Sequence, residues 1–254
     1  MSALAPASRQ SVASRMLKTL VSALIWLQII LIVLLWTAVV TTVFLITLPV
    51  DRVRYHAGRL CRIGRILLVK VNPFWRVRIS GHPIAKDHPP YILVSNHESI
   101  ADIPLLSHLP IEMKWLSKSS NFRIPFLGWM MSMGGDIPLK RGDKDSASGA
   151  LERCCWYLQR KTSVIVFPEG TRSQDGDLGQ FKEGAFRLAI ETGAPLLPVL
   201  VCGTREAVIK GSLLFNPNSA MWAHVLPPIE TRGLTMADLG PLKNRVRELM
   251  RAAR

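Results

Sequence analysis

The sequence predicts an α/β fold with a mostly parallel central sheet flanked by helices, preceded by an N-terminal membrane helix or helical hairpin. Three observations indicate this class. Residues 20–50 contain no charged side chain. Beyond Trp75, short runs rich in β-branched residues alternate with longer amphipathic stretches. Two of these runs, 164–167 and 196–201, are almost wholly apolar, as expected for central parallel strands that are covered on both faces.

The overall composition is compatible with one large domain that acts on or near anionic partners. The chain has 254 residues, 48% of them hydrophobic, and a formal net charge of +14. Such a charge suits a phosphate-bearing substrate, an anionic membrane surface or nucleic acid. The four cysteines, Cys61, Cys154, Cys155 and Cys202, have no metal-ligand spacing, so we interpret them as reduced thiols.

The chain is predicted to divide into a basic N-terminal segment (1–19), a membrane segment (20–50) and a cytoplasmic domain (51–254). About 20 apolar residues cross a bilayer as a helix, whereas a signal peptide has an apolar region of only about 7–15 residues. One tilted span is one arrangement, and a hairpin that bends near Gln28 or Thr41 is the other. The basic cluster that follows places the domain on the cytoplasmic side.

The elements of the domain follow from the alternation of these patterns. We expect strands at 76–80, 91–95, 114–117, 163–167, 196–201 and 222–226, and helices at 103–108, 126–133, 144–161, 183–192 and 236–252.

Loops at the carboxyl ends of strands form the binding sites of open α/β sheets. Three such loops carry charged residues directly after a buried run, at 96–102, 138–142 and 168–173. We therefore expect the functional groups to come from these three segments.

The first loop contains a histidine and an aspartate, His97 and Asp102. On a regular helix a spacing of five leaves the two side chains about 140° apart, so they meet only if a turn precedes the helix. Asp102 would then bind one ring nitrogen and leave the other as a general base. The alternative is a helix N-cap at Ser95 or Asn96 with an incidental histidine. Glu98 is expected to point away.

The chemistry expected of this base is activation of a substrate hydroxyl. No GxSxG motif supplies a serine nucleophile, and the cysteines lie in apolar or helical contexts. Nucleotide-binding motifs of the GxxxxGK[ST] and GxGxxG types are absent from the sequence. The remaining histidines show no metal-ligand spacing, so no metal site is expected.

The loop 168–173 has the character of an anion site. Gly170 permits a positive φ, and Thr171 and Arg172 offer backbone N–H groups and a guanidinium. Glu169 is expected to bind a substrate hydroxyl or to hold Arg172 in place. A structural turn with a surface arginine is the alternative.

Further pairs of basic residues follow other apolar runs. Lys140 and Arg141 form one, and Lys118 with Arg123 is another, although an exposed basic turn has the same pattern. The run 126–133 is rich in Trp and Met and indicates either a core helix or a wall for an acyl chain.

Four segments with recognisable motifs follow one another along the chain: Asn96–Asp102 (NHx4D), 134–141 (a glycine-containing block with a basic end), 167–173 (FPEGTRS) and 194–199 (apolar with a central proline). Together they resemble the glycerolipid acyltransferases, specifically the 1-acyl-sn-glycerol-3-phosphate (lysophosphatidic acid) acyltransferases, and the resemblance covers residues 90–203. The second segment departs from the family pattern because Pro138-Leu139-Lys140 intervene before the expected arginine, and we choose Arg141 for the cationic role.

This resemblance implies transfer of a fatty acyl group to the sn-2 hydroxyl of lysophosphatidic acid in phospholipid biosynthesis, with phosphatidic acid as product. His97 would deprotonate that hydroxyl, and Asp102 would orient the ring. The substrate phosphate would be held by Arg141, Glu169, Gly170, Thr171 and Arg172, with Asn96 and Lys118 in support.

No cofactor or metal is implied by the resemblance, and acyl-CoA or acyl-carrier protein would serve as co-substrate. The expected partners are a membrane lipid acceptor and an anionic membrane surface, with no nucleic acid. The expected location is the inner (cytoplasmic) membrane, with the catalytic domain on its cytoplasmic side.

Two other functions remain as alternatives. A related acyltransferase would use another acceptor, such as glycerol 3-phosphate or a lyso-aminolipid. A non-catalytic basic protein of the membrane surface or of nucleic acid would explain the charge, but it would not explain the histidine, aspartate and EGTR turn at strand ends.

Overall fold

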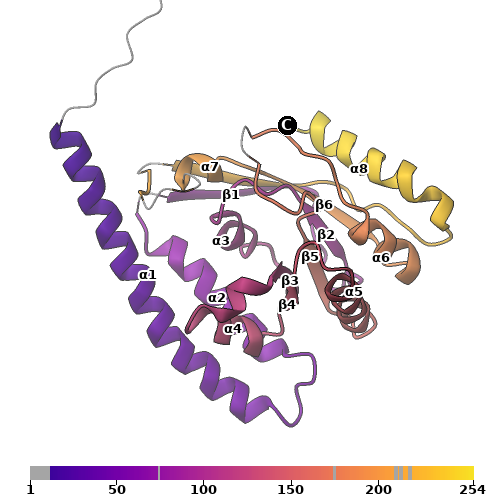
Figure 1. Ribbon diagram of the computed structural model, residues 1–254, viewed down its shortest axis with the longest axis horizontal. Coiled ribbons are helices and arrows are strands. Elements are labelled where there is room, and N and C mark those ends of the chain that lie inside the picture. The colour runs from indigo at the N-terminus through magenta and orange to yellow at the C-terminus, as the bar shows by residue number, and fades with distance from the viewer. Residues whose placement is uncertain (1–11, 74, 174–175, 209–210, 212–213, 217–218) are drawn as a thin grey trace, which may run out of the picture.

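A seven-stranded sheet forms the centre of the protein in the computed structural model (Figure 1). The structure describes residues 12–73, 75–173, 176–208, 211, 214–216 and 219–254, so most of the basic segment 1–19 lies outside it. The strand order is β1-β7-β6-β2-β5-β3-β4. The strands are β1 (Trp75–Gly81), β2 (Ile92–Ser95), β3 (Met113–Lys118), β4 (Ile137–Leu139), β5 (Ser163–Val166), β6 (Leu196–Cys202) and β7 (Ser219–Val225).

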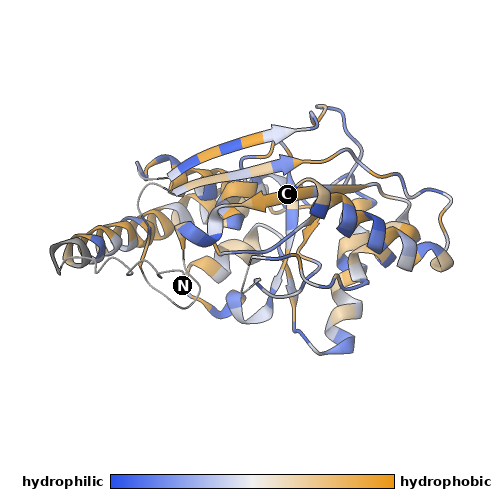
Figure 2. Cartoon of the chain, turned by 90° about the horizontal axis from the view of Figure 1, so that it is seen from above, coloured by the Kyte–Doolittle hydropathy of each residue, from blue (hydrophilic) through white to orange (hydrophobic). Residues whose placement is uncertain are grey.

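The predicted α/β class with a mostly parallel sheet is confirmed. All neighbouring strands pair in parallel except β6 and β7, which are antiparallel. The five strands β6, β2, β5, β3 and β4 therefore run in one direction, and their carboxyl ends meet at one edge. The strands β1 and β7 run in the opposite direction, so the carboxyl end of the edge strand β1 lies at the other edge of the sheet. The exposed side of β1 carries Arg76 and Arg78, and polar and apolar residues alternate along the strand (Figure 2).

Helices cover both faces of the sheet, because successive strand residues point to opposite sides. On β2, Ile92 and Val94 join a core with α5, α6 and α8, whereas Leu93 joins a core with α3 and α1. The helices on the first face are α5 (Lys144–Leu158), α6 (Gly184–Thr192) and α8 (Leu239–Ala252). Those toward the second face are α1 (Val12–Thr47), α2 (Tyr55–Lys70), α3 (Asp102–Leu106) and α4 (Leu127–Met133).

The predicted membrane segment forms a single continuous helix, α1, which passes through Gln28 and Thr41 without the bend that a hairpin there would need. By length and composition, Met16–Thr47 can cross a membrane, and little of it is buried. The helix packs along the domain. Ser22 accepts a hydrogen bond from Phe215 N (3.0 Å), and Trp36 Nε1 donates to Leu60 O (2.8 Å).

The basic stretch after α1 forms a helix, α2, which the sequence patterns do not single out. This helix is amphipathic, and its buried residues Ala57 and Cys61 pack against Val40 and Met130. The strand β4 and two short elements, η1 (Ser119–Arg123) and α7 (Thr204–Ala207), are also additional to the predicted ones. The predicted helix 236–252 forms as a short 3₁₀ turn, η2 (Met236–Asp238), followed by α8.

Candidate active site

The loops that follow β2, β5 and β6 meet at the carboxyl edge of the sheet. Ser173 N, on the loop after β5, donates to His97 O at 2.8 Å. Asn96 binds the end of β6 in both directions, since its Nδ2 donates to Val201 O (2.8 Å) and its Oδ1 accepts from Val201 N (2.7 Å). Asn96 therefore fixes the start of the loop that carries His97.

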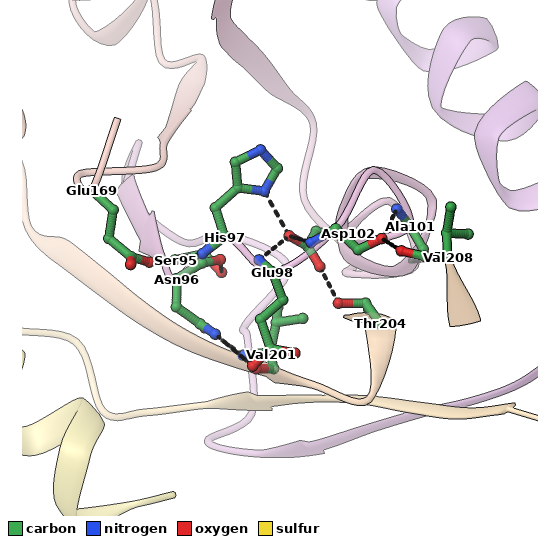
Figure 3. Close-up of polar contacts among 11 residues, drawn as sticks. Ser95, Asn96, His97, Glu98, Ala101, Asp102, Glu169, Val201, Thr204 and Val208 are labelled. Atoms are coloured by element: carbon green, nitrogen blue, oxygen red, sulfur yellow. Dashed lines mark hydrogen bonds and ion pairs between the residues drawn. The ribbon is translucent and has the colours of Figure 1, made fainter. Parts of the chain in front are cut away.

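His97 and Asp102 are in direct contact. The turn 96–101 precedes α3, which begins at Asp102, and this turn brings His97 Nδ1 to 2.6 Å from Asp102 Oδ2. The same oxygen accepts hydrogen bonds from the backbone N–H groups of Glu98 (2.8 Å) and Ser99 (3.0 Å). Since Asp102 is acceptor to the ring, the network assigns the proton to Nδ1 and leaves Nε2 free, on the side of the ring away from Asp102 (Figure 3).

Two further residues, which the sequence did not indicate, contact the His97–Asp102 pair. The Thr204 hydroxyl, buried at the start of α7, donates to Asp102 Oδ1. The Phe167 ring stacks on the His97 ring with centroids 4.1 Å apart and an interplanar angle of 17°. The sequence holds no signal for Thr204, because only the adjacency of β6 and β2 brings it to Asp102.

Glu169 takes a different place from the one expected. Its carboxylate is buried and accepts hydrogen bonds from His97 N (2.9 Å) and Gly179 N (3.0 Å). Burial raises the pKa of the Glu169 carboxyl, and the two N–H groups oppose that shift. Both oxygens thus bind backbone, and the residue holds the His97 loop instead of presenting its carboxylate to a phosphate.

Glu98 points away from the histidine, as expected, and is buried beneath the loop. Its Oε1 lies 3.5 Å from Asn96 Nδ2 and 4.0 Å from Arg254 Nη2. Burial, followed by the charge of Asp102, raises the pKa of Glu98 to about 7, while Arg254 lowers it.

A cavity of about 240 Å³ lies next to this pair: its wall includes Phe167, whose ring stacks on His97, although His97 itself is not part of the lining. Its walls combine apolar residues of β3, β5 and α5 with cations. Among the described residues, Lys118, Arg141 and Lys182 of this lining form no ion pair, whereas Lys140 binds Asp143 at 2.9 Å.

The EGTR turn contributes Gly170 to the cavity wall. Gly170 has a φ of +71°, and a Cβ there would lie 2.9 Å from Lys182 Nζ, a cation that the sequence analysis does not single out. Thr171 and Arg172 follow on the same turn, outside the lining residues. The structure therefore brings Lys118, Arg141 and Gly170 together.

No group of three His, Cys, Asp or Glu side chains suited to a metal ion occurs among the described residues. The fold and the site together define an α/β protein with a hydrogen-bonded His–Asp pair at the carboxyl edge of its sheet, next to a cation-lined, largely apolar cavity.

Comparisons with known proteins identify the family. The model of a family described as acyltransferase matches residues 76–202. The chain is 43% identical over 145 residues to a chloroplastic 1-acyl-sn-glycerol-3-phosphate acyltransferase of Arabidopsis thaliana, covering 57% of this chain and 41% of that protein. It is 30% identical over 210 residues to the alpha form of 1-acyl-sn-glycerol-3-phosphate acyltransferase of Mus musculus, covering 81% of this chain and 74% of that protein.

A solved structure shares the fold. The crystal structure of the 1-acyl-sn-glycerophosphate (LPA) acyltransferase PlsC from Thermotoga maritima matches with a TM-score of 0.64 and 25% identity, covering 89% of this chain and 96% of that one. The chain spans about two fifths of the length of the chloroplastic relatives it matches. The chain belongs to the acyltransferase family.

Proposed function

We propose that this protein transfers a fatty acyl group from a thioester donor to the sn-2 hydroxyl of lysophosphatidic acid, forming phosphatidic acid in phospholipid biosynthesis. The observation that carries the proposal is the 2.6 Å contact of His97 with Asp102, next to a cavity whose lining includes Lys118, Arg141 and Lys182. The activities for which the relatives are named support the same acceptor.

In this proposal His97 acts as a general base. Its free Nε2 removes the proton of the acceptor hydroxyl as the oxygen attacks the thioester carbonyl. The tetrahedral intermediate then collapses, the C–S bond breaks, and the departing thiolate takes the proton back from the imidazolium. Asp102 stabilises the imidazolium and fixes the ring orientation, as in other His–Asp pairs.

The acceptor phosphate is proposed to lie against the cavity cations. Arg141, Lys118 and Gly170 line the cavity, and Thr171 and Arg172 come next along the chain. A guanidinium binds phosphate through paired N–H groups, so Arg141 and Arg172 are the stronger ligands. Glu169 serves this site indirectly, through the His97 backbone.

The chemistry proposed here needs no metal or prosthetic group, since the substrate oxygen is the nucleophile and the thioester is already activated. The donor is acyl-CoA or acyl-carrier protein. Both carry the acyl group as a thioester, so the same attack of the acceptor hydroxyl on the thioester carbonyl applies to either donor.

A related acceptor is the second candidate. Glycerol 3-phosphate would offer the same phosphate to the cavity cations. A lyso-aminolipid without a phosphate monoester would leave Lys118, Arg141 and Lys182 with less charge to bind, so the cation-lined wall favours a phosphorylated acceptor.

The membrane contact is proposed to involve the outward face of α1. The helix touches the domain from Ser22 to Phe44, whose ring lies 4.5 Å from the Arg54 guanidinium. Contacts over this length favour a helix that stays on the domain over one that crosses the bilayer alone. We propose that α1 lies in the membrane interface with its exposed leucines in the lipid, and that the domain faces the cytoplasm from the inner membrane.

An acyl-transfer assay of the purified chain tests the proposal, with a panel of phosphorylated and unphosphorylated lysolipids as acceptors. We expect lysophosphatidic acid to be the preferred acceptor. The variants His97→Ala and Asp102→Asn should each lower kcat by about 10²–10⁴-fold. The far-ultraviolet circular dichroism of both variants should match that of the parent. Retained turnover in His97→Ala would exclude the base assignment, and preference for glycerol 3-phosphate would support the second candidate.

A further inference from the structure

A strained turn stands between η1 and α4. Leu127 N donates to Pro125 O at 2.7 Å, which closes a three-residue γ-turn around Phe126. Phe126 has φ +62° and ψ −56°, the rare form of this turn, which is unfavourable for a residue with a side chain. Glycine would adopt it freely, so folding alone does not account for a phenylalanine here.

The turn displays a group of exposed apolar side chains. Ile124 is 46% exposed, Phe126 37% and Trp129 54%, and Leu127 is also exposed. The rings of Phe126 and Trp129 have centroids 4.8 Å apart at an interplanar angle of 56°. We call these four residues the aromatic patch.

The aromatic patch adjoins α1. Leu127 shares a small apolar cavity with Ile32, Val33 and Trp36 of α1, so the two elements are in contact. Leu31 and Leu35 of the same part of α1 are exposed. The patch therefore extends an apolar surface that already includes the candidate membrane helix.

Basic residues connect the aromatic patch with the candidate site. Arg123 ends η1 next to Ile124, and Lys118, immediately before η1, lines the cavity beside His97. Indole rings with basic neighbours are typical of the boundary between lipid tails and headgroups. An acidic carrier protein would match the cations, but it would leave the apolar continuity with α1 unexplained.

We propose that the aromatic patch is a second lipid-contacting surface, which inserts into the bilayer interface beside α1 and brings the cavity to lysolipid held in the membrane. This rests on the proposed function for the identity of the acceptor. The strained turn at Phe126 projects the two rings, and Lys118 with Arg123 faces the anionic headgroups.

The test measures acyl transfer by the full chain to two forms of lysophosphatidate, one in a membrane and one free in solution. One is long-chain lysophosphatidate in vesicles of phosphatidylcholine and phosphatidylglycerol, and the other is a short-chain lysophosphatidate that is monomeric in water. Trp129→Asp and Phe126→Gly should lower kcat/KM on vesicles by about tenfold and leave turnover of the soluble acceptor within about twofold. Leu249→Asp, an exposed leucine on α8 at the other face of the sheet, is the matched control and should change neither.

The variants are designed to separate function from folding. Because glycine relieves the strain at position 126, Phe126→Gly should melt at the same temperature as the parent or higher. Equal loss with both acceptors would assign the aromatic patch to the substrate site and overturn the proposal. A loss of activity seen only with an acyl-carrier-protein donor would assign the aromatic patch to the binding of that carrier protein and overturn the proposal. An unchanged rate on vesicles would overturn it as well.

A second readout does not depend on turnover, so it separates this inference from the proposed function. Vesicles with brominated acyl chains quench tryptophan that reaches the lipid. Quenching of the parent chain should exceed that of Trp129→Phe, even if the acceptor assignment fails. Identical quenching in the two proteins would show that Trp129 does not reach the lipid.

Discussion

At the scale of single residues, His97 is fixed from three directions. Asp102 binds its ring, Phe167 stacks on the ring face, and Glu169 accepts the hydrogen bond of its backbone N–H. Thr204 then binds the remaining oxygen of Asp102. With the backbone and the ring both held, the proposed uptake of a proton by the imidazole needs little reorganisation.

Glu98 gives a pH-dependent stability that can be measured. Because its pKa is raised to about 7 in the folded protein from an ordinary value of 4.5, the folded state retains a proton that the unfolded state has lost. This residue therefore lowers stability as the pH rises from about 4.5 to about 7. We expect Glu98→Gln, measured as a difference in Tm from the parent, to be more stabilising at pH 8 than at pH 5. The charged or titratable groups facing Glu98 are Asp102, Arg254, Glu206, Arg205 and Cys202.

A constant difference in Tm across this range would mean that Glu98 titrates normally. The comparison uses urea or thermal unfolding of the full chain in detergent, since α1 needs an apolar environment.

At the scale of elements, the packing of α1 and α2 on the sheet depends on small residues and on one buried lysine. Lys114 of β3 donates to Arg54 O and Gly134 O, both at 2.8 Å, and so ties the α1–α2 connection to the sheet. Burial lowers the pKa of Lys114, and the nearby Asp136 opposes that shift. Gly64 of α2 allows Trp36 of α1 to approach closely.

The same substitution at two helical glycines should have opposite effects. A Cβ at Gly64 would lie 2.6 Å from the Trp36 ring, whereas one at Gly149 of α5 meets nothing within 4 Å. Gly149→Ala should raise stability by about 0.5–1 kcal/mol through helix propensity. Gly64→Ala should instead lower it by about 1–3 kcal/mol through overpacking. Melting curves check both signs, and a stabilising Gly64→Ala would contradict the close α1–α2 packing.

At the scale of the whole molecule, α1 serves two surfaces. Its inner side covers Ala57, Cys61 and Met130 of the domain through Val40, and its outer side exposes leucines. In the proposed membrane arrangement, attachment and domain stability are therefore carried by the same helix, and a truncation affects both.

Two variants should separate these roles. Deletion of residues 1–50 uncovers the apolar face beneath α1, so we expect a destabilised fragment of low soluble yield. Changing the outward residues Leu27, Leu31 and Leu35 to Gln should weaken vesicle binding and leave Tm nearly unchanged. Vesicle flotation and melting curves measure the two properties. A deletion that melts like the parent would show that α1 is not part of the fold.

Local patterns in the sequence determined much of this protein. Apolar runs predicted the strands of a parallel sheet, because both faces of such a sheet are buried. The spacing of His97 and Asp102 required a turn before a helix, and the structure has that turn. The ordered motifs indicated the acyltransferase family, which the comparisons confirmed.

Only the tertiary structure decided how the distant parts combine. Thr204 meets Asp102 across 102 positions because β6 lies beside β2, and Glu169 binds the His97 backbone because β5 lies on the other side. The long apolar run gave the length of α1 but not its position along the domain. Sequence periodicity reports which face of an element is buried, whereas contacts between elements depend on strand order and packing, which periodicity does not encode.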